Sequence, residues 1–210
     1  MKIGLVDVDG HHFPNLALMR LSAWHRSQGD TVEWWNGFTH YDRVYLSKVF
    51  TFTPDHDTVV DADEIITGGT GYKDYGALPP EVEAMFPDYS IYPQYKQAIG
   101  FLTRGCVRSC PWCIVPRKEG SIRPAADWDK LKRPDSRELV LMDNNVLACE
   151  HGLEQIRRMG REEEMGKASR DRQVNMFRHK RRRAPFHPMK RGFFTPSRRK
   201  FRHKIQKRKW

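Results

Sequence analysis

Basic residues are crowded into the C-terminal 50 positions of the 210-residue chain, and this limits how much of the chain can form a core. Residues 1–160 contain 18 Lys and Arg against 22 Asp and Glu, whereas residues 161–210 contain 19 against 4. A segment with so high a net charge and no regular apolar period buries too little apolar surface to offset its chain entropy. We therefore expect a folded part at 1–160, long enough for a core, and a basic, irregular, disordered tail at 161–210.

The first 71 residues alternate between short apolar runs and one segment with helical spacing. Apolar residues at Leu16, Met19 and Ala23 predict a helix over about 16–26, and turn residues flank each of the short runs. This alternation predicts an α/β fold with a small parallel sheet, a Rossmann-like N-terminal domain at 1–71. The strands are expected at the runs KIGLVD, TVEWW, RVYLS and ADEIITGGTGY.

A second α/β unit is predicted at 97–160, after a proline-rich stretch at 72–96. The prolines indicate an extended linker with one helical turn near PPEVEAMF. In the second unit, strands are expected at AIGFLT and ELVLMD and helices at AADWDKLK and HGLEQIRRMG, the last closed by Gly160. The unit therefore amounts to two βα repeats.

The remaining sequence signals bear on the compartment. Asp7 and Asp9 interrupt the N-terminal apolar run, which is unlike a signal peptide, and no window is long and apolar enough to span a membrane. Three of the four cysteines lie in one loop, a pattern that favours metal or catalytic use in a reducing compartment over a disulfide framework. We therefore expect a cytoplasmic protein without a membrane partner.

The loop FLTRGCVRSCPWCIVPRKEG carries the most specific chemical signal in the chain. Cys106, Cys110 and Cys113 follow a predicted strand, and Trp112 precedes the last of them. Three thiolates on a short loop can hold three irons of a 4Fe-4S cluster and leave the fourth iron open to a ligand. In spacing, aromatic residue and position, the loop resembles the hallmark of the radical S-adenosylmethionine (radical SAM) superfamily, which follows the first strand of a partial (β/α) barrel.

The resemblance implies a cofactor pair and a reaction class. Cys106, Cys110 and Cys113 would bind the 4Fe-4S cluster, and the open iron would bind S-adenosylmethionine. An electron donor would reduce the cluster, and a 5′-deoxyadenosyl radical would then abstract hydrogen from a substrate that the sequence does not identify. The backbone near Ile114 and Val115 would lie by the adenine. Many members place a Gly-Gly-Glu stretch after the second strand, against the methionine amino group, and that place is taken here by Asp143, Asn144 and Asn145.

A radical SAM barrel would need about six βα units, scaling from the eight-unit barrel, and only two are predicted here. The composition changes at Gly160, as a frameshift or recombination would leave it, so a truncated or altered C-terminus is expected. An open barrel would expose a radical to water, which argues against full activity of this chain. Translating the encoding DNA in the other two frames tests this expectation.

A structural metal site is the alternative interpretation of the cysteines. Zinc would take Cys149 or His151 as a fourth ligand beside the three loop thiols, although structural zinc usually uses pairs of cysteines at Cys-x-x-Cys spacing. In that case the basic tail, which interleaves aromatic residues with its cations, would bind nucleic acid, and the metal or iron–sulfur knot would only stabilise the fold.

Two further resemblances involve the first loop, GLVDVDGHHFPN. Asp7 and Asp9 followed by Gly10 resemble the nucleophile loop of haloacid-dehalogenase-type phosphatases, but His11 stands where Thr or Val is expected. The segments FPNLALMRLSAWHRSQGDTVEWW and ADEIITGGTG are more similar to the cobalamin-binding, Rossmann-like domain of many radical SAM enzymes. The ligating motif Asp-x-His-x-x-Gly ends here in Pro14, so we expect the domain to keep the fold without cobalamin.

Two weaker signals lie near these motifs. The turn Gly68-Gly69-Thr70-Gly71 could cradle a phosphate through its N–H groups, but it lacks a following lysine. Arg104 and Arg108 flank the cysteine loop and could interact with a carboxylate or with the charge of a cluster.

Overall fold

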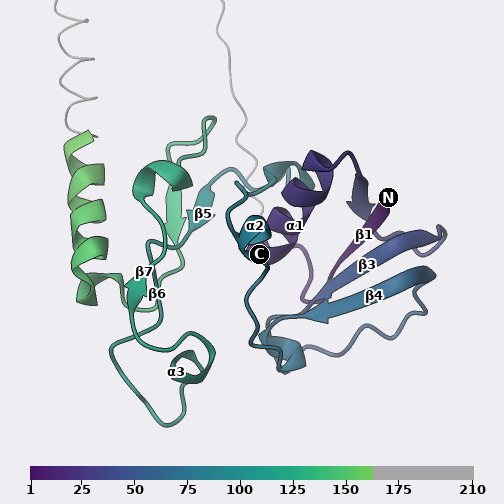
Figure 1. Cartoon of the computed structure of the whole chain (residues 1–210), viewed down its shortest axis with the longest axis horizontal. Coiled ribbons are helices and arrows are strands. Elements are labelled where there is room, and N and C mark those ends of the chain that lie inside the picture. The colour runs from purple at the N-terminus through teal and green to yellow at the C-terminus, as the bar shows by residue number, and fades with distance from the viewer. Residues whose placement is uncertain (163–210) are drawn as a thin grey trace, which may run out of the picture. The chain divides into compact units, whose positions relative to one another are not determined.

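The computed structural model describes residues 1–162, and it is a mixed α/β structure with a parallel sheet of four strands (Figure 1). The basic segment predicted at 161–210 lies, apart from its first two residues, outside the described part. The strand order is β2-β1-β3-β4, and the predicted strands in this region are all confirmed. The sheet and its helix comprise β1 (Lys2–Asp7), α1 (Leu16–Ser27), β2 (Thr31–Trp34), β3 (Tyr41–Ser47) and β4 (Ala62–Gly68).

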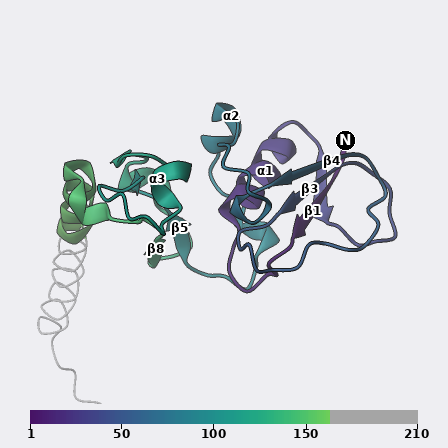
Figure 2. The same cartoon turned by 90° about the horizontal axis from the view of Figure 1, so that it is seen from below.

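The helix α1 covers one face of the sheet (Figure 2). It begins at Asn15, whose side chain accepts hydrogen bonds from the Ala17 and Leu18 N–H groups at 3.2 and 3.3 Å. Such a cap satisfies donors that have no partner inside the helix. Leu18, Met19 and other residues at helical spacing are buried against β1, so the predicted amphipathic helix is confirmed.

The opposite face of the sheet is covered by loops rather than by helices. Residues 35–40 and 48–61, which connect β2 to β3 and β3 to β4, are not helical. Trp35, Val60 and Tyr72 pack there against buried residues of the strands, including Val44 and Leu46. Parallel sheets usually have helices on both faces, whereas this sheet has a helix on one face and loops on the other.

The stretch 72–96 is part of the core, which corrects the expectation of an extended linker. The predicted helical turn is present as α2 (Pro80–Glu83), and a 3-10 helix follows at Tyr89–Ile91. Val82, Tyr89 and Tyr92 are buried in the same cluster as Leu18 of α1. The proline-rich stretch therefore packs against α1 and the sheet and does not extend into solvent.

A second, smaller set of strands follows. The strands β5 (Ala98–Gly100) and β8 (Leu139–Leu141) pair in parallel, as the two βα units predict. Between them, β6 (Thr103–Arg104) and β7 (Arg123–Pro124) form a short antiparallel pair that the apolar pattern does not predict. The helix α3 (Val115–Lys118) lies between β6 and β7 in the chain, and 3-10 helices occur at Trp128–Leu131 and Val146–Ala148.

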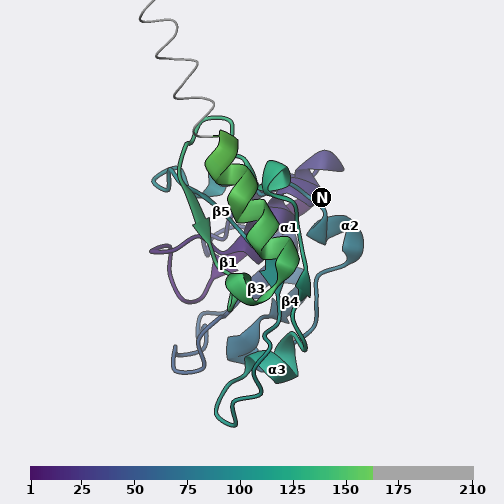
Figure 3. The ribbon, with the colours of Figure 1, turned by 90° about the vertical axis from the view of Figure 1, so that its left-hand side faces the viewer.

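Both helices predicted in this unit differ from expectation. The segment AADWDKLK forms only the 3-10 turn, because Asp127 before it and Lys132 after it are extended, and the Ala125 and Ala126 N–H groups donate to the distant Leu102 carbonyl. The last helix covers 150–162 and is not closed by Gly160 (Figure 3, green). A glycine inside a helix lowers its stability by only about 1 kcal/mol relative to alanine. Arg161, which follows Gly160, is still helical and pairs with Glu154 of the same helix at 2.9 Å.

The buried position of Tyr92 leads to a test of the core. Tyr92→Ala removes a fully buried ring, so we expect the free energy of unfolding to fall by roughly 3 kcal/mol or more. Chemical denaturation measures this change. Tyr75→Ala, in the same segment but half-exposed, serves as the control and should cost less than about 1 kcal/mol. Equal losses of stability in the two variants would contradict a place for this segment in the core.

Candidate metal centre

The cysteine loop is closed at its base by the β6–β7 pair. Gly105 has a φ of +79°, and a Cβ atom there would lie 2.3 Å from the Ser121 carbonyl oxygen. Only glycine fits both conditions. The next residue, Cys106, donates its N–H to the Gly120 carbonyl at 3.3 Å. The two ends of the loop therefore run side by side.

The Glu119 carboxylate joins these ends. It accepts hydrogen bonds from the Gly105 N–H at 2.9 Å and from Arg104 Nη1 at 3.1 Å. Asn144 Nδ2, after β8, donates to the same carboxylate at 2.9 Å. The Glu119 side chain is only 12% exposed, so these contacts are shielded from water. Sequence reasoning missed this residue, because a single Glu in the basic stretch RKEG has the pattern of a surface charge.

The three loop cysteines are free, partly buried thiols. A backbone hydrogen bond from Cys113 to Cys110, at 3.0 Å, forms a turn between two of them, and the Arg108 N–H points to Cys106 Sγ at 3.4 Å. Within residues 1–162, no three potential metal-binding side chains are gathered into one site. Thiols are nevertheless the donors that iron–sulfur clusters take, so the donor set of the loop fits such a group.

The side chains beside the cysteines differ in their exposure to solvent and in their contacts with other residues. Trp112 is 88% exposed, and Arg108 is also exposed. Arg104 is not available to a cofactor carboxylate, because it pairs with Glu119 and stacks 3.6 Å above the Phe101 ring. Of the two flanking arginines, only Arg108 therefore keeps the solvent-facing position that a role toward a bound anion requires.

Ile114 and Val115 lie where α3 begins. The Ile114 carbonyl accepts from the N–H groups of Arg117 and Lys118, so the backbone after Cys113 turns directly into the helix. Lys118 Nζ donates to Thr70 Oγ1 at 2.6 Å, and partial burial lowers the pKa of this lysine. The glycine-rich turn at 68–71 thus has a lysine beside it, supplied by the cysteine loop and not by its own sequence.

The three residues after β8 have separate roles. The Asp143 carboxylate accepts from the Leu102 and Thr103 N–H groups and from Thr103 Oγ1, at 2.5 to 3.1 Å. Asn144 reaches Glu119, whereas Asn145 precedes the 3-10 helix without capping it through its side chain. The structure therefore brings Asn144 to the base of the cysteine loop and uses Asp143 to hold the chain after β5.

The carboxyl ends of β1 and β3 form another candidate site, since ligands of parallel sheets bind where the strand order reverses. Here Asn15 Nδ2 donates to Ser47 Oγ at 2.8 Å, and the Tyr92 hydroxyl donates to the partly buried Asp7 carboxylate at 2.7 Å. The His11 ring lies 4.1 Å from that of Trp34. The polar groups at this edge are thus already hydrogen-bonded to other side chains of the protein.

Asp9, the second carboxylate of the first loop, organises the chain after β3. It accepts hydrogen bonds from the Val49 and Phe50 N–H groups and from Thr53 Oγ1. A carboxylate with three internal donors is not free for the acid–base role that the phosphatase resemblance implies.

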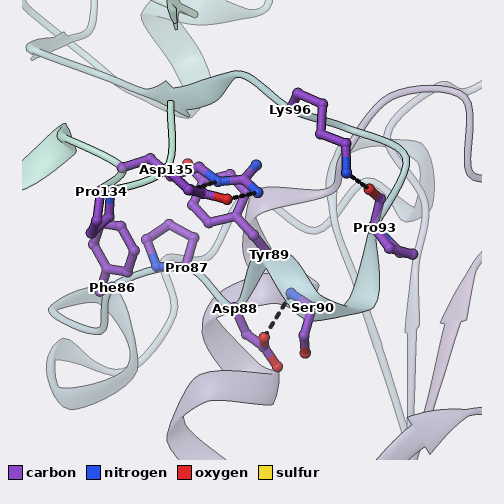
Figure 4. Close-up of a pocket in the computed structure, with 10 residues that line it drawn as sticks. Phe86, Pro87, Asp88, Tyr89, Ser90, Pro93, Lys96, Pro134 and Asp135 are labelled. Atoms are coloured by element: carbon purple, nitrogen blue, oxygen red, sulfur yellow. Dashed lines mark hydrogen bonds and ion pairs between the residues drawn. The ribbon is translucent and has the colours of Figure 1, made fainter. Parts of the chain in front are cut away.

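Figure 4 shows a cavity with no cysteine in its wall. Its volume is about 450 Å³, and Arg133 in its wall stacks 4.3 Å over the Tyr89 ring and pairs with Asp135. None of the residues discussed above in the cysteine loop or after β8 contributes to the wall. The lining residues are Phe86, Pro87, Asp88, Tyr89, Ser90, Pro93, Lys96, Arg133, Pro134 and Asp135.

Comparisons of the chain with protein-family models, with curated proteins and with solved structures gave no match. No helix in residues 1–162 has the length and apolar character to cross a bilayer. The function is therefore argued from the site itself.

The hydrogen bonds of Asp143 lead to a stability prediction. Asp143→Ala leaves the N–H groups of Leu102 and Thr103, both in fully buried residues, without their acceptor. We expect a loss of about 1–3 kcal/mol in the free energy of unfolding for each unpaired group. Chemical denaturation measures it, with the exposed Asp57→Ala as a control. A loss as small as that of the control would contradict a structural role for Asp143.

Burial raises the pKa of the Asp7 carboxyl despite the hydrogen bond from Tyr92. The folded state therefore holds the proton more tightly than the unfolded state, and the contribution of Asp7 to stability is lost as pH rises through the raised pKa. Asp7→Asn keeps an acceptor for Tyr92 and has no such loss. We expect its stability relative to the parent chain to increase from about pH 3.5 to pH 7 in denaturation curves. A difference that does not change with pH would rule out a raised pKa.

Proposed function

We propose that the chain is an iron–sulfur protein of the radical SAM type, with Cys106, Cys110 and Cys113 as ligands of a 4Fe-4S cluster. The observation that carries the proposal is the position of three free thiols on one loop whose base is closed by β6 and β7. Asn144, which follows β8, reaches that base through Glu119, so the loop is joined to the carboxyl end of a parallel strand pair. Active sites of α/β barrels form at this end of the strands.

When bound, a cluster of this kind supplies the single electron that cleaves S-adenosylmethionine for radical chemistry. The three thiolates bind the irons, and the backbone at Ile114 and Val115 offers a surface beside the last cysteine. Asn145 is the polar side chain after β8 that remains for a cofactor, since the Asp143 carboxylate is used within the fold and the Asn144 amide donates to Glu119. The substrate and the electron donor lie beyond what these residues specify.

Zinc is less well supported than a cluster. His151, one expected fourth ligand, points Nε2 to the Ala126 carbonyl at 3.0 Å, and Cys149 follows a 3-10 helix, 36 positions after Cys113. A structural zinc site would need one of these two residues to complete its four ligands. The proposed nucleic-acid binding of the basic tail involves residues outside the described part.

The two sheets support a finer assignment of the fold. We propose that β1 to β4 form a Rossmann-like unit of the cobalamin-domain kind that holds no cobalamin, because His11 packs on Trp34 and Tyr92 covers Asp7. The parallel β5–β8 pair supports the assignment of residues 97–160 to the first two βα units of a partial barrel.

Reconstitution with iron and sulfide under anaerobic conditions tests the proposal. The full chain should take up roughly four irons, and Cys106→Ala should lose the cluster, because a missing thiolate leaves a second iron without a protein ligand. Iron and sulfide analysis together with the visible absorption spectrum measures the uptake. With a strong reductant and S-adenosylmethionine, the loaded chain should release 5′-deoxyadenosine.

Cys149→Ala is the matched control, since Cys149 is the one cysteine outside the loop. It should retain the cluster as well as the parent chain does. Stoichiometric zinc without iron uptake, or loss of metal on changing Cys149, would reject the cluster in favour of a zinc knot.

A further inference from the structure

The two ends of the cysteine loop meet at the largely buried side chain of Glu119. One end is Gly105, whose N–H donates to the carboxylate, and the other end is Glu119 itself, six residues after Cys113. The backbone of the same residue is also engaged, because its N–H donates to the Val115 carbonyl at 2.7 Å and its carbonyl accepts from Arg123. All three cysteines lie between two chain ends that this residue connects.

A chain of charged groups holds Glu119 in place from the other side. Arg104 pairs with Glu119 at 3.1 Å and with Glu83 of α2 at 3.7 Å. Glu83 in turn pairs with Arg20 of α1. Arg104 is further restricted by its stacking on Phe101. The carboxylate therefore has a position set by α1, α2 and β6, and it does not depend on the conformation of the cysteines.

Asn144 connects the same carboxylate to the chain after β8. The Glu119 carboxylate thus accepts hydrogen bonds from two separate segments, one at Arg104 and Gly105 and the other at Asn144. A glutamate on an exposed loop would gain little from such contacts, but at 12% exposure their geometry is maintained against competition from water.

We propose that Glu119 is a positioning residue of the cysteine loop, which holds its two ends together so that the three thiols can bind one cluster. This inference rests on the proposed iron–sulfur function. Residues around a metal site that orient its ligands typically change metal affinity by tenfold or more when they are replaced. A loop with free ends loses conformational entropy when it binds metal, which weakens binding. A loop whose ends are already held together has lost much of this entropy on folding.

The test compares three full-length variants after reconstitution with iron and sulfide. Glu119→Ala should release iron to an added chelator roughly tenfold faster than the parent chain. Glu119→Gln should lie between the two, because its amide oxygen still accepts from Gly105 while the charge that pairs with Arg104 is absent. Glu154→Ala removes an exposed ion pair with Arg161 on the last helix, and it should behave like the parent chain.

Circular dichroism and the thermal midpoint of the metal-free variants separate positioning from folding. Metal-free Glu119→Ala should keep the circular dichroism spectrum of the parent chain. If this variant unfolds, Glu119→Gln decides the matter, and its release of iron should still be several-fold faster than that of the parent.

The possible outcomes distinguish this inference from the proposed function. If the parent chain and the Glu119 variants release iron equally slowly, the positioning role is overturned and the cluster proposal stands. If the parent chain takes up no cluster at all, the proposed function fails and the inference fails with it. Rapid release in the Glu119 variants alone, with partial rescue by Gln, supports the role assigned to this carboxylate.

Discussion

Two buried tyrosine side chains connect the four-stranded sheet to the β5–β8 pair. The Tyr92 hydroxyl donates to Asp7 at the carboxyl end of β1, and the Tyr89 hydroxyl accepts from the Ile99 N–H of β5 at 2.9 Å. Both rings lie in the apolar cluster that α1 covers. Since β5 leads directly to β6 and the cysteine loop, the position of the thiols depends on how these two side chains are packed. A buried hydroxyl must find a partner, and each of these satisfies a group on a different sheet.

Around the cysteine loop, carboxylates act on the backbone rather than as reagents. Asp143 accepts from the chain after β5, Asp9 from the chain after β3, and Glu119 from both the loop and the chain after β8. Each accepts from an N–H group that lies shortly after the end of a strand and would otherwise lack a partner. These three carboxylates therefore contribute to the fold, whereas the three loop cysteines are free thiols.

Much of the fold follows from local patterns. The four strands of the first sheet and the helix α1 match the apolar runs and the helical spacing, because both faces of β1 are buried and α1 has one buried side. The failures occur where backbone groups find tertiary partners. The Ala125 and Ala126 N–H groups donate to the Leu102 carbonyl, and Val82 and Tyr92 of the proline-rich stretch are buried in the core beside residues of α1. Leu102 and the residues of α1 are distant in the sequence from the segments that they contact.

The sequence by itself determined which donor atoms the loop offers, because three thiols at this spacing in one loop are a local property of the chain. It also determined the strands, whose pattern depends on which side chains avoid water. Only the tertiary structure decided which polar residues serve the site. Glu119 and Asn144 are 25 positions apart, and Asp143 lies about 40 positions from the groups that it holds. A hydrogen bond depends on distance in space, and a single sequence contains no record of that distance.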